Sequence, residues 1–178
     1  MLTDTLAPLA HALVVELEDE LQTTRRVLAR VPDAQFNWQP HPKSMQIGYL
    51  ASHITDLMGG IANTLVTSEL DLAYFLEREA QPATNSRELL ERLDTNGATA
   101  LTAPTAATPN DFEHLWILRQ GEQILMSQTR AETIRHLINH MAHHRGQLSV
   151  YLRLLDVPVP AIYGPSADEP MFQGQVGV

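Results

Sequence analysis

The chain has 178 residues, of which 44% are hydrophobic and 19% are charged, and this balance predicts one soluble globular domain spanning residues 1–178. Its formal net charge of −9 argues against a nucleic-acid-binding surface and against attraction to an anionic membrane, and no apolar window reaches the roughly 18 residues of a membrane span. Because the chain has no cysteine, disulfides, a cysteine nucleophile and cysteine-ligated metals are excluded.

Two long amphipathic helices are predicted in the first part of the chain. The first spans residues 5–30, where apolar residues recur every three to four positions, and Pro32 ends it. The second spans residues 45–66, and its Gly59-Gly60 pair either loosens the helix or allows close packing against a neighbour. The N-terminus lacks a basic region and an uninterrupted apolar run, so the expected location is cytoplasmic.

The middle of the chain predicts a third helix between two less regular segments. Residues 69–79 either extend the second helix or form a short separate one. The third helix spans residues 86–101, and Asn85-x-x-Glu88 resembles the capping box that would begin it. Residues 98–109 are rich in alanine, threonine and proline, which predicts a loop.

The last part of the chain predicts a long fourth helix preceded by a segment of alternating apolar residues. In residues 112–128 that alternation is interrupted by a Gln-Gly pair, so a small β-hairpin is one interpretation and an extended linker is the other. Thr129-x-x-Glu132 is a capping box that begins a helix over residues 130–155. The fold class is therefore all-α, a four-helix bundle with a short hairpin or extended segment before the last helix.

Four of the eight histidines lie in the last helix, and two of them suggest a metal site. His140 and His144 are four residues apart in an apolar stripe, so their rings share one helix face and can bind a single ion. His53 borders the apolar stripe of the second helix. Three protein nitrogens with an open coordination position are the composition of a catalytic zinc-type site. The alternatives are a solvated helix face for the pair and a hydrogen-bonded core-edge histidine for His53.

The remaining histidines fit such a site less well. His136 lies on the same face as His140, but eight residues of helix place it about 12 Å from His144 at the Cα atoms, so it pairs only with His140. His143 points about a quarter-turn away from His144. No role is assigned to the three that have no patterned partner, namely His11, His41 and His114.

No competing catalytic motif stands out. The chain has no glycine-rich phosphate loop, no nucleophile elbow and no His-Glu-x-x-His, since no glutamate lies between His140 and His144. Asp56 follows His53 by one helical turn and is the only candidate for a carboxylate base. The alternative for Asp56 is a solvated helix residue.

Together these residues resemble the DinB/YfiT superfamily of metal-binding four-helix bundles, and the resemblance covers nearly the whole chain. The pattern that carries it combines a helical histidine motif with a proline-rich tail, which is far more specific than the histidine pair. The matching stretches are Val31-Pro32 through Trp38-Gln-Pro40, Lys43-Ser44-Met45, His53, Asn139 through Arg153, Val157-Pro-Val-Pro160 and Tyr163-Gly-Pro165.

The resemblance implies that His53, His140 and His144 hold a divalent metal ion, commonly nickel or zinc. It also implies a homodimer in a bacterial cytoplasm that acts on a small-molecule substrate. Arg145 and Gln147 match the family pattern, which leaves helix packing, dimer contacts and substrate binding open as their roles.

Proteins of this superfamily have several activities. Some resemble thiol transferases that use a low-molecular-weight thiol such as bacillithiol, mycothiol or glutathione, others are related to maleylpyruvate isomerases, and many have been called metal-dependent hydrolases. We expect a thiol-dependent S-transferase. The alternatives are a metal-dependent hydrolase, a non-catalytic metal-binding dimer, and a metal-free bundle whose histidines no longer bind an ion.

Overall fold

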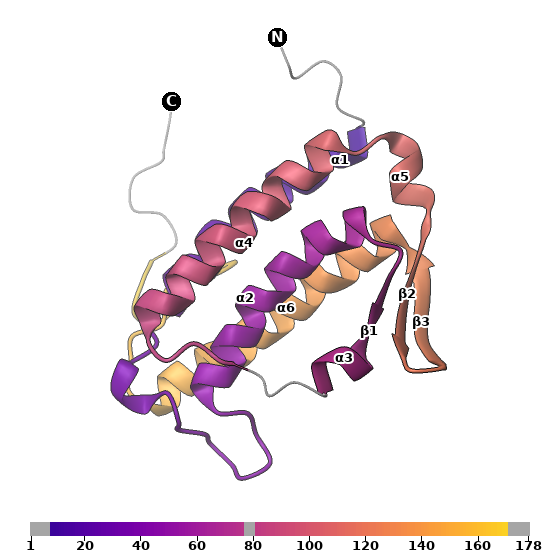
Figure 1. Cartoon of the computed structure of the whole chain (residues 1–178). Coiled ribbons are helices and arrows are strands. Elements are labelled where there is room, and N and C mark those ends of the chain that lie inside the picture. The colour runs from indigo at the N-terminus through magenta and orange to yellow at the C-terminus, as the bar shows by residue number, and fades with distance from the viewer. Residues whose placement is uncertain (1–7, 77–80, 171–178) are drawn as a thin grey trace, which may run out of the picture.

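Four long helices form the body of the protein. The computed structural model describes residues 8–76 and 81–170, so residues 5–7 of the first predicted helix lie outside it. Figure 1 shows two layers, with α1 behind α4 and α2 beside α6, and α2 packs against both α4 and α6. The predicted four-helix bundle is confirmed, with helices α1 (Pro8–Leu28), α2 (Ile47–Val66), α4 (Ser86–Ala106) and α6 (Arg130–Leu154).

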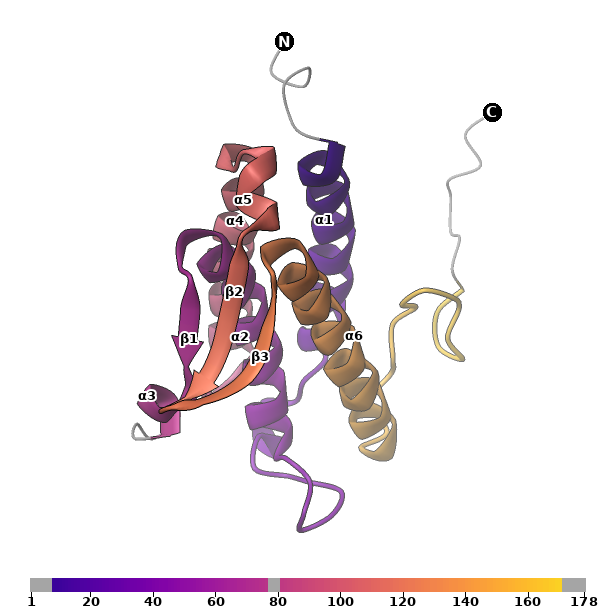
Figure 2. The same cartoon turned by 90° about the vertical axis from the view of Figure 1, so that its right-hand side faces the viewer.

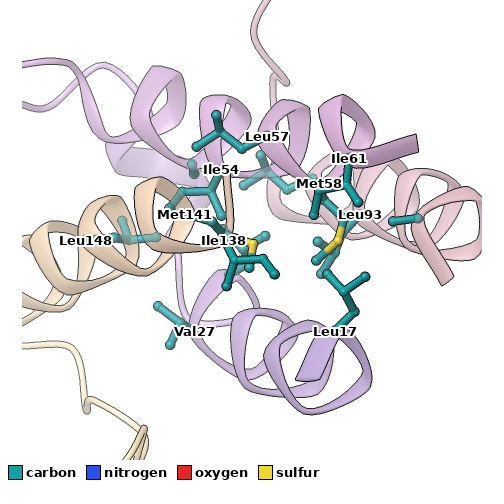
Figure 3. Packing of buried hydrophobic residues seen from close by; sticks show 14 of the residues in the cluster. Leu17, Val27, Ile54, Leu57, Met58, Ile61, Leu93, Ile138, Met141 and Leu148 are labelled. Atoms are coloured by element: carbon teal, nitrogen blue, oxygen red, sulfur yellow. The ribbon is translucent and has the colours of Figure 1, made fainter. Parts of the chain in front are cut away.

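The apolar stripes of these helices meet in one core (Figure 3). Removing a leucine or isoleucine side chain from water stabilises the fold by about 1.5–3 kcal/mol, so the shared core holds the helices together. The labelled core residues come from all four helices, namely Leu17, Val27, Ile54, Leu57, Met58, Ile61, Leu93, Ile138, Met141 and Leu148.

Side-chain caps begin the third and fourth long helices where the sequence predicts them. The Asn85 side chain accepts a hydrogen bond from the main-chain N–H of Glu88 at 2.9 Å, while the Glu88 carboxylate turns to the N–H of Thr84. At the start of α6, Thr129 and Glu132 bond reciprocally to each other's main-chain N–H, at 3.2 and 2.8 Å. Each cap satisfies donors that the first helical turn leaves without an internal partner.

The predicted loop over residues 98–109 is wrong, because α4 continues to Ala106 and a short helix, α5 (Pro109–Glu113), follows it. Burial outweighs the loop-like composition, because Ala100 and Pro104 lie in the bundle interior. The threonine hydroxyls along this stretch donate to main-chain carbonyls inside the helix, so these polar groups are satisfied without breaking it. A proline near the end of a helix forfeits only one of its hydrogen bonds.

Of the two alternatives for residues 112–128, the structure has the hairpin, and it belongs to a three-stranded sheet. Strands β2 (Leu115–Gln120) and β3 (Gln123–Thr129) are antiparallel, and Gly121 takes a left-handed φ of 56° at their turn. β1 (Glu69–Asp71), which the sequence did not predict, runs parallel to β2 at the edge of the sheet. Figure 2 shows the sheet standing beside α2 and the first turns of α6.

The chain after α2 does not continue that helix, which was one of the two predicted alternatives for residues 69–79. After β1 the chain forms a separate short helix, α3 (Leu72–Leu76), which agrees with one of the two predicted alternatives, although residues 77–79 lie outside the described part. A single 3₁₀ turn (Asp33–Gln35) similarly opens the crossing between α1 and α2.

The Gly59-Gly60 pair allows close packing rather than loosening α2. A Cβ atom on Gly59 would lie 3.0 Å from the Asn96 side chain of α4, and one on Gly60 would lie 3.4 Å from Leu137 of α6. Gly59 therefore lets α2 lie close to α4, whereas a Cβ on Gly60 would make only an ordinary van der Waals contact with α6. α2 also packs along α6, and this packing brings the histidines of the two helices together.

Candidate metal centre

Three histidines from α2 and α6 meet where these helices pack together. The ring centroid of His53 lies 5.3 Å from that of His140 and 4.9 Å from that of His144. The centroids of the two α6 rings are 4.6 Å apart, and their Nε2 atoms are 2.8 Å apart. One nitrogen from each ring can be chosen so that all three lie within 4.8 Å of one another.

The cluster is largely shielded from water. His144 is only 6% exposed, and His53 and His140 are half-buried. Burial, followed by the proximity of His144 and His140, lowers the pKa of His53 from its ordinary 6.5 to about 4. Burial and the neighbouring histidines likewise lower the pKa of His140. Both rings are therefore neutral at pH 7 and have a nitrogen lone pair free to bind a cation.

Gln147 orients the third ring. Its side-chain oxygen lies 2.8 Å from Nδ1 of His144, and because an amide oxygen can only accept, Nδ1 carries the proton and donates it. The lone pair of His144 then resides on Nε2, which accepts a hydrogen bond from the Nε2–H of His140 at 2.8 Å. Hydrogen bonds of this kind select the tautomer of metal-binding histidines. Sequence reasoning named Gln147 without this role, although its position three residues after His144 was the available signal.

The donor set fits a divalent metal ion. Zinc–nitrogen bonds of about 2.0–2.1 Å in tetrahedral geometry place two ligand nitrogens roughly 3.3 Å apart. This separation lies between the 2.8 Å that joins the Nε2 atoms of His140 and His144 and the 4.8 Å within which all three ligand nitrogens lie. His53 makes ring contacts with both partners but no hydrogen bond within the described residues. Neutral imidazoles without a carboxylate are donors typical of zinc, nickel or copper rather than magnesium or calcium.

Asp56 does not join this cluster. It lines a hollow between α2 and α4 together with Glu88, Arg92 and Asn96, so it faces the other helix layer. Within residues 8–76 and 81–170, the histidine trio is the one candidate group of metal ligands, and it contains no carboxylate. The structure therefore does not support Asp56, the candidate that the sequence suggested, as a carboxylate base beside the imidazoles.

The other histidines lie apart from the trio or at its edge. His136 is exposed, and its ring centroid lies 5.9 Å from that of His140, whereas exposed His143 contacts the ring of its neighbour His144. Those for which the sequence suggested no role lie elsewhere: His41 accepts a hydrogen bond within its own turn, His114 bonds to a neighbouring side chain, and His11 is exposed on α1.

Arg145 faces away from the trio and has a packing role. It is 1% exposed, its guanidinium lies 2.6 Å from the Glu20 carboxylate and donates to the Thr24 hydroxyl at 2.9 Å, both on α1. It also donates to the hydroxyl of Tyr163 and lies over that ring, 5.1 Å from its centroid. Arg145 therefore links α6, α1 and the C-terminal tail. Of the roles that the sequence left open for Arg145, these contacts correspond to helix packing.

An aromatic pair lies farther along the face of α6 that carries His140 and His144. Tyr151 follows His144 by seven residues, which is about two helical turns and returns to the same face. Its ring packs edge-on against Trp38, from the crossing between α1 and α2, with centroids 5.7 Å apart. Both side chains are half-buried.

Comparisons with known proteins agree with this architecture. The model of the DinB family matches residues 1–175. The protein YrdA of Bacillus subtilis (strain 168) is 24% identical over 152 residues, which cover 85% of this chain and 86% of YrdA. No helix within the described residues is long and apolar enough to cross a membrane.

Two solved structures share the fold. A DinB-like protein of Bacillus subtilis, YjoA, has a TM-score of 0.64 at 16% identity, covering 92% of this chain and 99% of its own. A DinB-like protein from Bacillus cereus has a TM-score of 0.68 at 18% identity, covering 86% of this chain and 97% of its own. At these identities the likeness establishes the fold.

Proposed function

This chain belongs to the DinB family, and from that premise we propose that it is a metal-dependent S-transferase that uses a low-molecular-weight thiol. His53, His140 and His144 are the proposed ligands of one divalent ion, nickel or zinc. The observation that carries the proposal is the convergence of three imidazoles, at least two of them held neutral by burial, with no carboxylate among them.

The chemistry follows from the donor set. When bound, a divalent ion supplies positive charge that lowers the pKa of a thiol, so that the sulfur is nucleophilic near neutral pH. His53, His140 and His144 would hold the ion, and the thiolate that it would supply could displace a leaving group from an electrophilic carbon, with the thiol proton passing to solvent or to the leaving group. Burial of His144 and the half-burial of its partners limit the access of water to the three imidazoles.

Hydrolysis is the second candidate, and the position of Asp56 weighs against it. A metal-dependent hydrolase generally needs a base beside the attacking water, and that base contributes about 10²–10⁴-fold to the rate. The carboxylate closest in sequence to His53 on the ligand helix faces α4 instead. Thiol transfer requires no such base, because the lowered thiol pKa supplies the nucleophile.

We also propose that the protein acts as a homodimer. Val150 and Leu154 lie one turn apart on α6 and are 57% and 58% exposed, so they offer an apolar surface for a second copy. Sedimentation of the purified protein should give twice the monomer mass. Replacing both residues with lysine should give the monomer.

The first experiment is metal analysis of protein purified without a histidine tag. Wild type and His143→Ala should each retain one equivalent of nickel or zinc after reconstitution, whereas His53→Ala, His140→Ala and His144→Ala should lose it.

The second experiment is an activity assay of the metal-loaded protein with an electrophile such as 1-chloro-2,4-dinitrobenzene and bacillithiol, mycothiol or glutathione. Turnover that requires a thiol supports transfer. Turnover without thiol supports a hydrolase, and metal binding without any turnover supports a non-catalytic dimer.

A further inference from the structure

Three histidines on α6 form a ladder of decreasing exposure. His136 is exposed, His140 is half-buried, and His144 is 6% exposed. They are spaced four residues apart, so their rings lie one above another on a single helix face. Two of them belong to the proposed metal centre, and His136 is the one whose purpose that centre leaves unexplained.

The spacing of the ladder makes His140 a member of two pairs. Its ring centroid lies 5.9 Å from that of His136 on one side and 4.6 Å from that of His144 on the other. An exposed imidazole can rotate to bring a nitrogen toward its neighbour at little cost, so either pair can hold one cation. His136 and His144 are about 12 Å apart at their Cα atoms and cannot share an ion.

The residues around the proposed centre favour entry of a divalent ion from the end of α6 that carries His136. Beyond His144, the same face of α6 carries Tyr151, which is half-buried against Trp38. His144 is itself closed off from solvent, and α2 covers the side on which His53 lies. The exposed imidazole that continues the His140–His144 row on this face is therefore His136.

We propose that His136 and His140 form a capture site for a divalent ion on its way to the centre made by His53, His140 and His144. The ion binds first to the exposed pair and then exchanges one ligand at a time, with His140 retained throughout. His136 is absent from the final ligand set. This inference rests on the proposed metal centre, and it assigns a function to a histidine outside that centre.

The test compares rates with affinity. A residue on the route but outside the final site changes the barrier in both directions, so its loss slows binding and release by the same factor and leaves the dissociation constant unchanged. Metal-free protein is mixed with Zn²⁺ in stopped flow, release is followed by a chromophoric chelator, and affinity is obtained by competition at equilibrium. For His136→Ala we expect both rate constants to fall several-fold with an unchanged Kd.

Two further variants make the result specific. His143→Ala removes another exposed imidazole next to a proposed ligand, and its rate constants should match wild type. His136→Cys restores a metal-binding side chain at the same position and should recover fast binding.

Each other outcome contradicts the inference in a recognisable way. Unchanged rates for His136→Ala, or equal slowing in His143→Ala, would show that there is no dedicated capture site while leaving the centre intact. A weaker Kd with faster release from His136→Ala would place His136 in the final site. Absence of Zn²⁺ binding by wild type at equilibrium would remove the centre and the capture site together.

Discussion

The side-chain oxygen of Gln147 lies 2.8 Å from Nδ1 of His144 and so determines which nitrogen of that ring is free. Loss of an outer hydrogen bond of this kind typically reduces metal affinity by about 10–100-fold. We expect a loss in that range for Gln147→Leu, measured by chelator competition, and a much smaller one for Gln147→Glu, which keeps an accepting oxygen.

Because Gln147 is exposed, its replacement should change the free energy of unfolding by no more than about 0.5 kcal/mol. Gln22→Leu, an exposed glutamine on α1, is the matched control and should leave affinity unchanged. Equal affinity of Gln147→Leu and wild type would mean that the hydrogen bond does not orient the ring.

Acid should destabilise the metal-free protein through His53. Its pKa is about 4 in the folded chain and 6.5 ordinarily, so between these values the unfolded state binds a proton that the folded state does not. The free energy of unfolding should therefore fall as the pH decreases from 6.5 to about 4, and this contribution should not fall further below that. The lowered pKa of His140 acts in the same direction.

Urea denaturation at several pH values between these limits measures the effect. His53→Gln should reduce the pH dependence, whereas replacement of the exposed His11 by glutamine should preserve it. If His53→Gln and wild type had the same slope, the imidazole would be equally protonatable in both states.

Removing Arg145 should be strongly destabilising. It is 1% exposed and pairs with the Glu20 carboxylate at 2.6 Å, and breaking a buried pair by deleting one partner costs about 3–5 kcal/mol. Arg145→Ala should show this loss in urea denaturation. Arg153→Ala breaks a surface pair with Asp168 and should cost about 0–1 kcal/mol.

The combined variant Glu20→Met with Arg145→Met removes both charges, so neither is left unpaired in the interior. It should recover much of the free energy of unfolding that Arg145→Ala loses. Failure of the double variant to improve on Arg145→Ala would mean that the cost comes from shape rather than from an unpaired charge.

Replacing Asp56 should leave thiol transfer intact. Asp56 lines the hollow toward α4, so Asp56→Asn should retain the metal and keep kcat/KM within about twofold of wild type, as expected of a surface change worth no more than about 0.5 kcal/mol. A fall of about 10²–10⁴-fold with normal metal content would instead identify Asp56 as a general base and favour hydrolysis.

Local signals in the sequence predicted the parts of the structure that depend on neighbouring residues. The i, i+4 spacing of His140 and His144 is a property of one helix, and the Thr129 cap is formed within four residues. His53 was harder to predict, because its place beside α6 depends on how α2 packs. Its position at the edge of an apolar stripe was enough to suggest it.

The features that the sequence did not predict depend on distant partners. β1 has three residues and exists as a strand because it pairs with β2, so that Glu69 lies beside Ile117 far along the chain. Likewise, residues 98–106 have a loop-like composition, and burial of Ala100 and Pro104 in the bundle determines that they are helical. No short window of sequence contains either contact.

Tyr163 lies over Arg145 and bonds to both members of the Arg145–Glu20 pair. One of the last described segments of the chain thus shields a charge pair that joins two helices. A product of interrupted translation or proteolysis that lacked Tyr163 would leave this pair open to water, although its helices and all three histidines were present. The integrity of the helical body therefore depends on a residue outside the helices, and a variant that lacks the segment around Tyr163 should be degraded faster in cells than one that keeps it.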